Sequence, residues 1–202
     1  MNGVGNENAE FGNKGRAVKE TVLLYLHDFV FWLAGILLLF MLVFRVVVVN
    51  GPSMNDTLVH GDYLLILNNF FAGEPKQGDV VVIGLQSYKQ GEPLIKRVIA
   101  TEGQWVDIDF DAGKVYVNGN LLDEPYTRTP TNLFEGVDFP LQVESGCVFV
   151  LGDNRNESKD SRSMEIGQID KREVLGKAFF LFLPGKDPYT TKTEFSRIGV
   201  IS

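Results

Sequence analysis

The strongest pattern in the chain is one long apolar run near its start. From Phe29 to Phe44 no charge interrupts the sequence FVFWLAGILLLFMLVF. Residues 21–26 and 46–49 extend the run, with His27 and Asp28 interrupting its first part and Arg45 marking its far edge. A helix needs about 20 mainly apolar residues to cross the hydrocarbon core of a bilayer. Nearly every face of this run is apolar, which disfavours a helix that packs one face on a soluble core. The pattern therefore predicts one transmembrane helix over residues 21–49.

Charges beside the run predict its orientation. Lys14, Arg16 and Lys19 precede it, whereas Arg45 alone lies near its far end. Short segments rich in Lys and Arg stay on the cytoplasmic side of a membrane. We therefore expect residues 1–20 to be a mobile cytoplasmic tail.

Residues 50–202 would then lie outside the cell membrane, attached to the lipid bilayer by a single pass. The alternative is a cleaved signal peptide, whose apolar part would be about 7–15 residues long and would end in small residues. This run is longer and ends in FRVVVVNGPS, so a retained anchor is favoured.

After residue 50 the pattern changes to short apolar runs between turn residues, which is typical of strands. The expected strands are Tyr63–Leu67, Val80–Leu85, Leu94–Ala100, Trp105–Phe110, Lys114–Val117, Cys147–Leu151 and Lys177–Leu183. Asn118-Gly119 follows one of them and is typical of a hairpin turn. Helical periodicity is absent, except for single turns expected after Ser163 or near Asp170. Many short strands with few helices predict a mainly β fold of curled antiparallel sheets.

One stretch of this region differs in character. Residues 111–144 are more polar and contain Pro125, Pro130 and Pro140. We interpret them as a small subdomain inserted between two runs of core strands.

Composition narrows the classes of function. The chain has 202 residues, a net charge of −7 and a pI near 4.9, with no basic stripe, so a nucleic acid partner is not expected. The single cysteine, Cys147, excludes an internal disulfide. Together with only two histidines, His27 and His60, it argues against a metal cluster. We expect no metal ion and no cofactor.

Ser53 is the first candidate for chemistry, because it directly follows the apolar run. A serine hydroxyl is a weak nucleophile and needs a base. His27 belongs to the membrane segment. His60 lies only seven residues from Ser53, in a probable turn, and would reach it only through a tight local fold.

Lys96 is the stronger candidate for the base. A period of two places it on an apolar strand face, with Leu94, Val98 and Ala100. Burial favours the uncharged form of an amine, which can accept a hydroxyl proton. Arg97 cannot do this, because its guanidinium stays protonated. Taken alone, a lysine in a strand is more often an edge residue whose amine reaches solvent.

Five motifs carry a resemblance to a known family. GPSMNDTL, GDYLLI, GDVVVI, IKRVIATEG and GDNRNESKDSR occur in the order found in the type I signal peptidases of bacteria, also called leader peptidases. The similarity covers the apolar segment and nearly all of the region after it. It implies a membrane-anchored serine endopeptidase that removes N-terminal signal peptides from secreted precursor proteins, cutting after small residues at positions −1 and −3. It also implies a β-rich core with a smaller second region.

The resemblance assigns roles to particular residues. Ser53 would be the nucleophile, Lys96 the general base of a Ser/Lys dyad, and Ser158 the hydroxyl that orients the lysine. Asp153 would pair with Arg97.

We interpret Asp160 and Arg162 as structural, because charge-assisted hydrogen bonds can fix the loop that carries Ser158.

Two positions depart from the family pattern. Asp56 stands where a proline is usual, in a position that shapes the loop rather than the chemistry. Gly51 stands where some members have a serine that donates to the oxyanion. The oxyanion hole is then expected to depend on backbone N–H groups, chiefly that of Ser53, with Gly51 allowing close approach.

Two other functions fit parts of the sequence. A self-cleaving, repressor-type Ser–Lys protease would be soluble and joined to a DNA-reading domain, which the apolar segment and the acidic charge disfavour. A catalytically silent, membrane-anchored β domain that binds partners is disfavoured by the joint presence of Ser53, Lys96 and Ser158.

Overall fold

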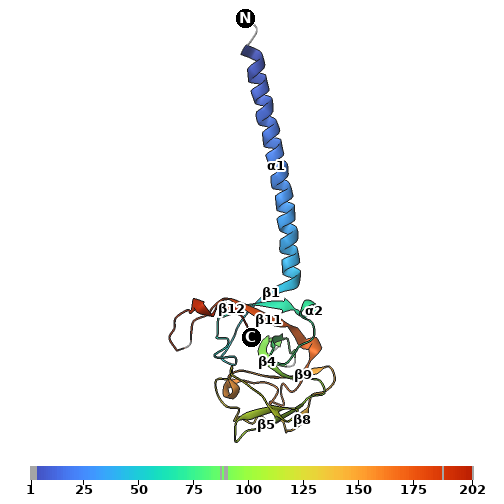
Figure 1. Cartoon of the computed structure of the whole chain (residues 1–202), viewed down its shortest axis with the longest axis vertical. Helices are drawn as coiled ribbons and strands as arrows, with labels where there is room; N and C mark the ends of the chain where they lie inside the picture. Colours follow the sequence, from blue (N-terminus) through green and yellow to red (C-terminus); the bar gives the residue numbers. More distant parts are fainter. Residues whose placement is uncertain (1–3, 87, 89–90, 188, 202) are drawn as a thin grey trace. The chain divides into compact units, whose positions relative to one another are not determined.

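The computed structural model describes residues 4–86, 88, 91–187 and 189–201, with side chains described from residue 19 onward. The chain divides into two compact units after Val43. The first is a single long helix, α1, and the second is a β-rich body (Figure 1).

Helix α1 (Val4–Val43) contains the predicted apolar run. Over Lys19–Val43 its mean hydropathy is 2.2 and none of its apolar window is buried, so it is long and apolar enough to cross a membrane. The expectation of a mobile tail over residues 1–20 differs from the structure, in which residues 4–20 are already helical.

The far end of the predicted anchor also differs. The helix ends at Val43, and Phe44–Val48 form strand β1, which pairs antiparallel with β2 (Tyr63–Asn68). The reason is the run of valines after Arg45: β-branched side chains suit a pleated sheet, and β2 offers a free edge for them.

The body is built on an antiparallel sheet that has eight strands within the described residues. Its order is β1-β2-β11-β3-β4-β9-β10, with β12 paired to β11. The remaining bounds are β3 (Val80–Ile83), β4 (Leu94–Thr101), β9 (Cys147–Leu151), β10 (Ile169–Asp170), β11 (Val174–Leu183) and β12 (Gly199–Val200). Short helical segments are α2 (Asn69–Ala72), η2 (Arg155–Glu157), η3 (Lys171–Glu173) and η4 (Phe195–Arg197).

A second, smaller sheet lies at the end of the body away from β1 and β11 (Figure 1). Its order is β7-β6-β5-β8, with β5 (Trp105–Asp109), β6 (Lys114–Val117), β7 (Asn120–Leu121) and β8 (Leu141–Gln142). In sequence it falls between β4 and β9, which are themselves paired. This sheet therefore includes Trp105–Asp109 as well as strands from the predicted insertion, residues 111–144.

The prediction of a mainly β fold is confirmed, and each of the seven expected strands is present. The Asn118-Gly119 hairpin is also confirmed: both residues have positive φ, 52° and 77°, and Val117 pairs with Asn120 across the turn. The expected turn near Asp170 is η3. Besides β1, the unpredicted strands are pairs of residues, too short to show a period.

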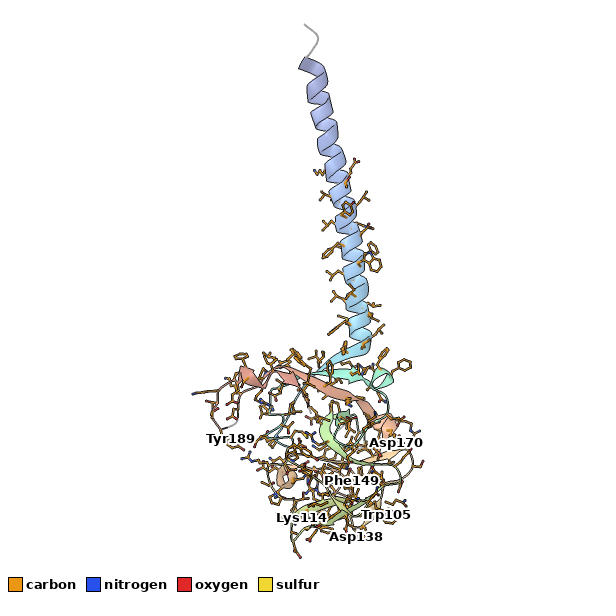
Figure 2. The ribbon with its side chains drawn as sticks, in the orientation of Figure 1. Trp105, Lys114, Asp138, Phe149, Asp170 and Tyr189 are labelled. Atoms are coloured by element: carbon orange, nitrogen blue, oxygen red, sulfur yellow. The ribbon has the colours of Figure 1, made fainter. Side chains whose placement is uncertain are left out.

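The interior joins the two sheets into one body. Phe149, labelled in Figure 2, is fully buried in an apolar cluster that packs β4 and β9 against β5 and β6. A second cluster, which includes Leu64, seats Met54 and Leu58 from the loop after β1. Strand β4 is central, so residues 95–100 are buried on both faces rather than on one.

Replacing Leu64 by Ala should test this second cluster. Leu64 is 0% exposed, and deleting a fully buried leucine side chain costs about 2–5 kcal/mol of unfolding free energy. Denaturant unfolding of the full chain in detergent micelles would measure the loss. The matched control is Leu121→Ala in β7, where the leucine is 56% exposed and the change should be small. Equal losses in the two variants would contradict the proposed core.

Candidate active site

Ser53 lies on a tight loop that joins β1 to β2. The loop is closed at its base by backbone hydrogen bonds from Val49 N to the Asp62 carbonyl and from Gly61 N to the Val49 carbonyl, both 2.9 Å. Met54 and Leu58 are buried in the core beneath it. The Ser53 side chain, between these anchors, is half-buried and open to solvent on one side.

Lys96 comes to the same point from strand β4. Its Nζ lies 2.8 Å from Ser53 Oγ. The residue is 3% exposed, so its amine is held in the interior, whereas Ser53, which it contacts, is only half-buried. Burial of an ammonium is costly and favours the neutral amine. The contact can therefore pass a proton from hydroxyl to amine.

His60 does not take this position. It is exposed, and its Nδ1 accepts a hydrogen bond from the backbone N–H of Gly51 at 3.3 Å. Gly51 has a φ of +93°, which a side chain would strain. The histidine thus contacts the backbone before Ser53 rather than the Ser53 hydroxyl.

The loop after β9 is tied to the Ser53 loop. The backbone N–H of Asn154 donates to the Ser53 carbonyl at 3.0 Å, and Asn154 Nδ2 donates to the Pro52 carbonyl at 3.1 Å. At Gly152 the two loops approach so closely that a Cβ would overlap Ser158 Oγ and the Ser53 carbonyl. Only glycine fits this crossing.

Ser158 is brought into the site by this crossing. It is 4% exposed, and within the described residues its Oγ has no hydrogen-bond partner. The structure therefore places the hydroxyl beside the Ser53 backbone without the expected hydrogen bond to Lys96. A buried hydroxyl without a partner is unusual in folded proteins.

Arg97 and Asp153 form a fully buried, two-pronged ion pair. Arg97 Nε donates to Asp153 Oδ1 at 2.9 Å and Nη2 donates to Oδ2 at 2.8 Å. Thr57 Oγ1 donates to the same carboxylate at 2.6 Å, and Arg97 Nη1 donates to the Gly78 carbonyl at 2.9 Å. The pair connects β4, the loop after β9 and the Ser53 loop.

Asp160 and Arg162 form a second buried pair inside the loop that carries Ser158. Arg162 Nε and Nη2 donate to the two Asp160 oxygens at 2.8 and 2.9 Å. Asp160 also accepts from Gly152 N at 3.0 Å, and Arg162 donates to the Ser158 carbonyl at 3.3 Å. The pair shapes this loop and makes no contact with the Ser53 hydroxyl.

The polar insertion supplies contacts that the sequence did not reveal. Arg155 donates to both carboxylate oxygens of Glu124 and to Thr131 Oγ1. The ring of Tyr126 lies 3.9 Å from the Arg97 guanidinium carbon. Burial, reinforced by the Glu124 charge, raises the pKa of the Tyr126 phenol, so the phenol stays neutral. The insertion thus covers the ion pair next to Lys96.

A further missed pair closes the other side of the Ser53 loop. Arg197 donates to both oxygens of Asp62, at 3.0 and 2.6 Å, and to the Thr57 carbonyl at 3.3 Å. Asp62 is 0% exposed and also accepts from the backbone of Val59 and Gly185. The GDYLLI motif was the signal for this aspartate, but nothing in the sequence pointed to its partner 135 residues away.

Sequence comparison assigns this site to a family. The family model described as "Signal peptidase, peptidase S26" matches residues 22–183. The chain belongs to this family. A signal peptidase I of Bacillus licheniformis is 36% identical over 149 residues, which cover 70% of this chain and 77% of that protein.

A second sequence relative agrees with this assignment. A signal peptidase I of Bacillus caldolyticus is 37% identical over 157 residues, which cover 71% of this chain and 82% of that protein. A crystal structure of a signal peptidase I from Enterococcus faecalis V583 aligns with 52% of this chain and 97% of its own, at 29% identity and a TM-score of 0.42. The sequence matches establish that this chain is an enzyme, a serine endopeptidase.

Asp56, where this signal peptidase departs from the family pattern, is exposed. Its carboxylate lies 3.4 Å from Arg128 Nη1, on the insertion. Because the pair is at the surface, it contributes little to stability. The departure therefore adds a contact at the rim of the site and leaves the Ser53–Lys96 contact as it is.

Replacing Arg97 by Ala should strongly destabilise the body. The change leaves the fully buried Asp153 carboxylate without its cation, which costs about 3–5 kcal/mol of unfolding free energy. Denaturant unfolding would measure it.

Arg172→Ala is the matched control, because Arg172 also bonds both oxygens of an aspartate, Asp170, but is 89% exposed. Its loss should leave the free energy of unfolding nearly unchanged. Similar effects of the two substitutions would show that the Arg97 pair does not brace the site.

Proposed function

We propose that this signal peptidase removes N-terminal signal peptides from secreted precursor proteins by a Ser/Lys dyad mechanism. The observation that carries the proposal is the 2.8 Å contact between Lys96 Nζ and Ser53 Oγ. It joins a buried amine to a half-exposed hydroxyl, which is the pairing that acyl transfer requires.

Lys96 acts as the general base and then as the general acid. The neutral amine takes the Ser53 proton as the oxygen attacks the carbonyl carbon of the scissile peptide bond. The resulting ammonium gives that proton to the departing amine, and the acyl group remains on Ser53. Lys96 then takes a proton from water as the water oxygen attacks the ester carbon. When the bond to Ser53 Oγ breaks, Lys96 returns that proton to Ser53 Oγ, and the product leaves as a carboxylic acid that ionises in solution.

The oxyanion is stabilised by backbone N–H groups. Gly51 has no side-chain donor. Apart from Gly51 and its two chain neighbours, no described residue has a heavy atom within 4 Å of the position its Cβ would occupy, so a substrate carbonyl can approach there. The Ser53 N–H is the chief donor. A donor of this kind contributes about 3–4 kcal/mol to transition-state stabilisation.

Ser158 orients the base. Its buried hydroxyl has no other partner among the described residues, and it lies at the Gly152 crossing beside Ser53. We assign it to the lysine amine, to which it donates or from which it accepts as the amine changes charge. The pairs Arg97–Asp153 and Arg162–Asp160 keep this loop in position.

The substrate class follows from the family and the anchor. We assign a preference for small side chains at positions −1 and −3, which shallow pockets beside Ser53 would enforce by excluding larger groups. The single helix α1 would hold the enzyme in the membrane, with the short N-terminal segment cytoplasmic and the body extracytoplasmic. Tethering raises its effective concentration at signal peptides lodged in the same bilayer.

Ser53→Ala, Lys96→Ala and Lys96→Arg should each abolish cleavage. The first removes the nucleophile and the other two remove the base, since a guanidinium stays protonated. Loss of a dyad member lowers kcat by about a thousandfold or more. The measurement is mass-spectrometric detection of the products from a synthetic signal-peptide substrate, with the full chain in detergent micelles.

Two exposed residues of the same types serve as controls. Ser145→Ala and Lys114→Ala, both on exposed positions, should leave cleavage unchanged. A second substrate with a large residue at −1 should remain uncut. Full activity in Ser53→Ala or Lys96→Ala would contradict the proposed Ser/Lys dyad mechanism.

Ser158→Ala should lower kcat by about tenfold or more without lowering stability. The hydroxyl makes no hydrogen bond among the described residues, so its removal should leave the free energy of unfolding unchanged. Only the orientation of Lys96 should become less precise. Ser161→Ala should behave in the opposite way, because Ser161 Oγ accepts from Val150 N at 3.0 Å and its removal leaves that buried N–H unpaired. Comparing kcat with the unfolding midpoint for both variants tests the role. An unimpaired Ser158→Ala enzyme would refute it.

A further inference from the structure

Glu135 lies in the part of the insertion that runs beside the Ser158 loop. Arg162 Nη1 donates to the Leu133 carbonyl at 3.2 Å, Val137 N donates to the Arg162 carbonyl at 3.1 Å, and Gly136 forms a bridge with Ser163. These contacts clamp the two segments together on both sides of Glu135. Its carboxyl group is therefore directed at the residues that follow Ser158.

The carboxyl group is buried and only partly satisfied. The Glu135 side chain is 10% exposed, and its Oε2 has no hydrogen-bond partner within the described residues. Its Oε1 lies 3.9 Å from Lys159 Nζ. A carboxylate that is buried at this cost, outside the dyad, calls for a functional account.

Charged groups of both signs surround this carboxyl group. Burial, and then the negative charge of Asp160, raises the pKa of Glu135. Arg162, Lys159 and the Asp160 backbone N–H act in the opposite direction. Glu165, the other acidic neighbour of Lys159 at 4.0 Å, is 65% exposed. Protonation of Glu135 thus occurs at a higher pH than for an ordinary glutamate.

We propose that Glu135 is a positioning residue for the dyad reaction: its ionised carboxylate attracts the Lys159 ammonium and so holds the segment that follows Ser158, and thereby the Ser158 hydroxyl, beside Ser53. The proposal rests on the proposed function, because Ser158 must orient Lys96 for Glu135 to matter. Protonation of the carboxylate removes its attraction to the Lys159 ammonium. The hold is complete above the pKa of Glu135 and is lost as the pH falls through it.

The test is the pH profile of kcat for the wild type and for Glu135→Gln, which mimics the protonated form. In alkaline solution the variant should be slower by about tenfold, with KM unchanged, because misplacement of a group in the site acts on the chemical step. As the pH falls, Glu135 of the wild type is protonated and its attraction to Lys159 is lost as well. The ratio of the two kcat values should therefore approach one.

Glu165→Gln is the matched control. It removes the same charge from the neighbourhood of Lys159, but from an exposed position, and its rate should equal that of the wild type at every pH. Lys159→Met gives an independent check on the full chain. Without this cation Glu135 ionises less readily, so the acid limb of the profile should move to higher pH.

A double substitution tests the route through Ser158. If Glu135 acts by positioning that hydroxyl, adding Glu135→Gln to Ser158→Ala should slow the enzyme no further, since effects that share one pathway are not additive. A fully additive loss of kcat in the double variant would overturn the proposal. So would a ratio of wild-type to Glu135→Gln kcat that stays constant with pH, or a Glu135→Gln pH profile identical to that of the wild type. An acid limb that does not move in Lys159→Met would also overturn it.

Failure of the proposed function would look different. It would show as cleavage by Ser53→Ala or Lys96→Ala, whereas failure of the Glu135 proposal leaves both of those variants inactive.

Discussion

The contact between one buried amine and one half-exposed hydroxyl is the constraint on which the rest of the site depends. An isolated ammonium in an apolar interior is unfavourable, and a serine hydroxyl without a base is a poor nucleophile. In this structure Lys96 lies on a central strand and Ser53 lies on a loop packed on the core. Burial favours the uncharged amine, and the uncharged amine supplies the base that the serine needs. The strand holds the amine away from water, and in the proposed mechanism the loop presents the hydroxyl to a substrate.

Keeping that contact requires several segments to meet. Ion pairs between arginines and largely buried carboxylates tie them together, namely Arg97–Asp153, Arg155–Glu124 and Arg197–Asp62. A fourth pair, Arg162–Asp160, shapes the Ser158 loop itself. The desolvation of buried charges offsets much of their attraction, so such pairs are weak sources of net stability. Their planar, two-pronged geometry instead sets distances and orientations. The insertion and the C-terminal segment thus contribute to the site without touching Ser53 Oγ.

The limits of sequence reading are clear at particular elements. Strands such as Lys114–Val117 were predicted within a residue, because alternation and a following Asn-Gly turn are local signals. The residues of strand β1 were predicted to belong to the transmembrane helix, because their valines continue the apolar run. Only their pairing with β2 shows that they form a strand. The ion pair between Asp62 and Arg197 could not be predicted from the sequence, because no local pattern links two residues that far apart.

The sequence by itself determined the residue types, their order and the alternation that makes Lys96 a strand residue. Motif resemblance then named Ser53, Lys96 and Ser158 together. Only the tertiary structure decided which partners they meet: the amine 2.8 Å from the hydroxyl, His60 turned to the Gly51 backbone, Ser158 left unpaired, and Glu135 against the Ser158 loop. The physical reason is that periodicity reports local conformation, whereas contacts across 43 residues depend on strand register and on how loops close over the core.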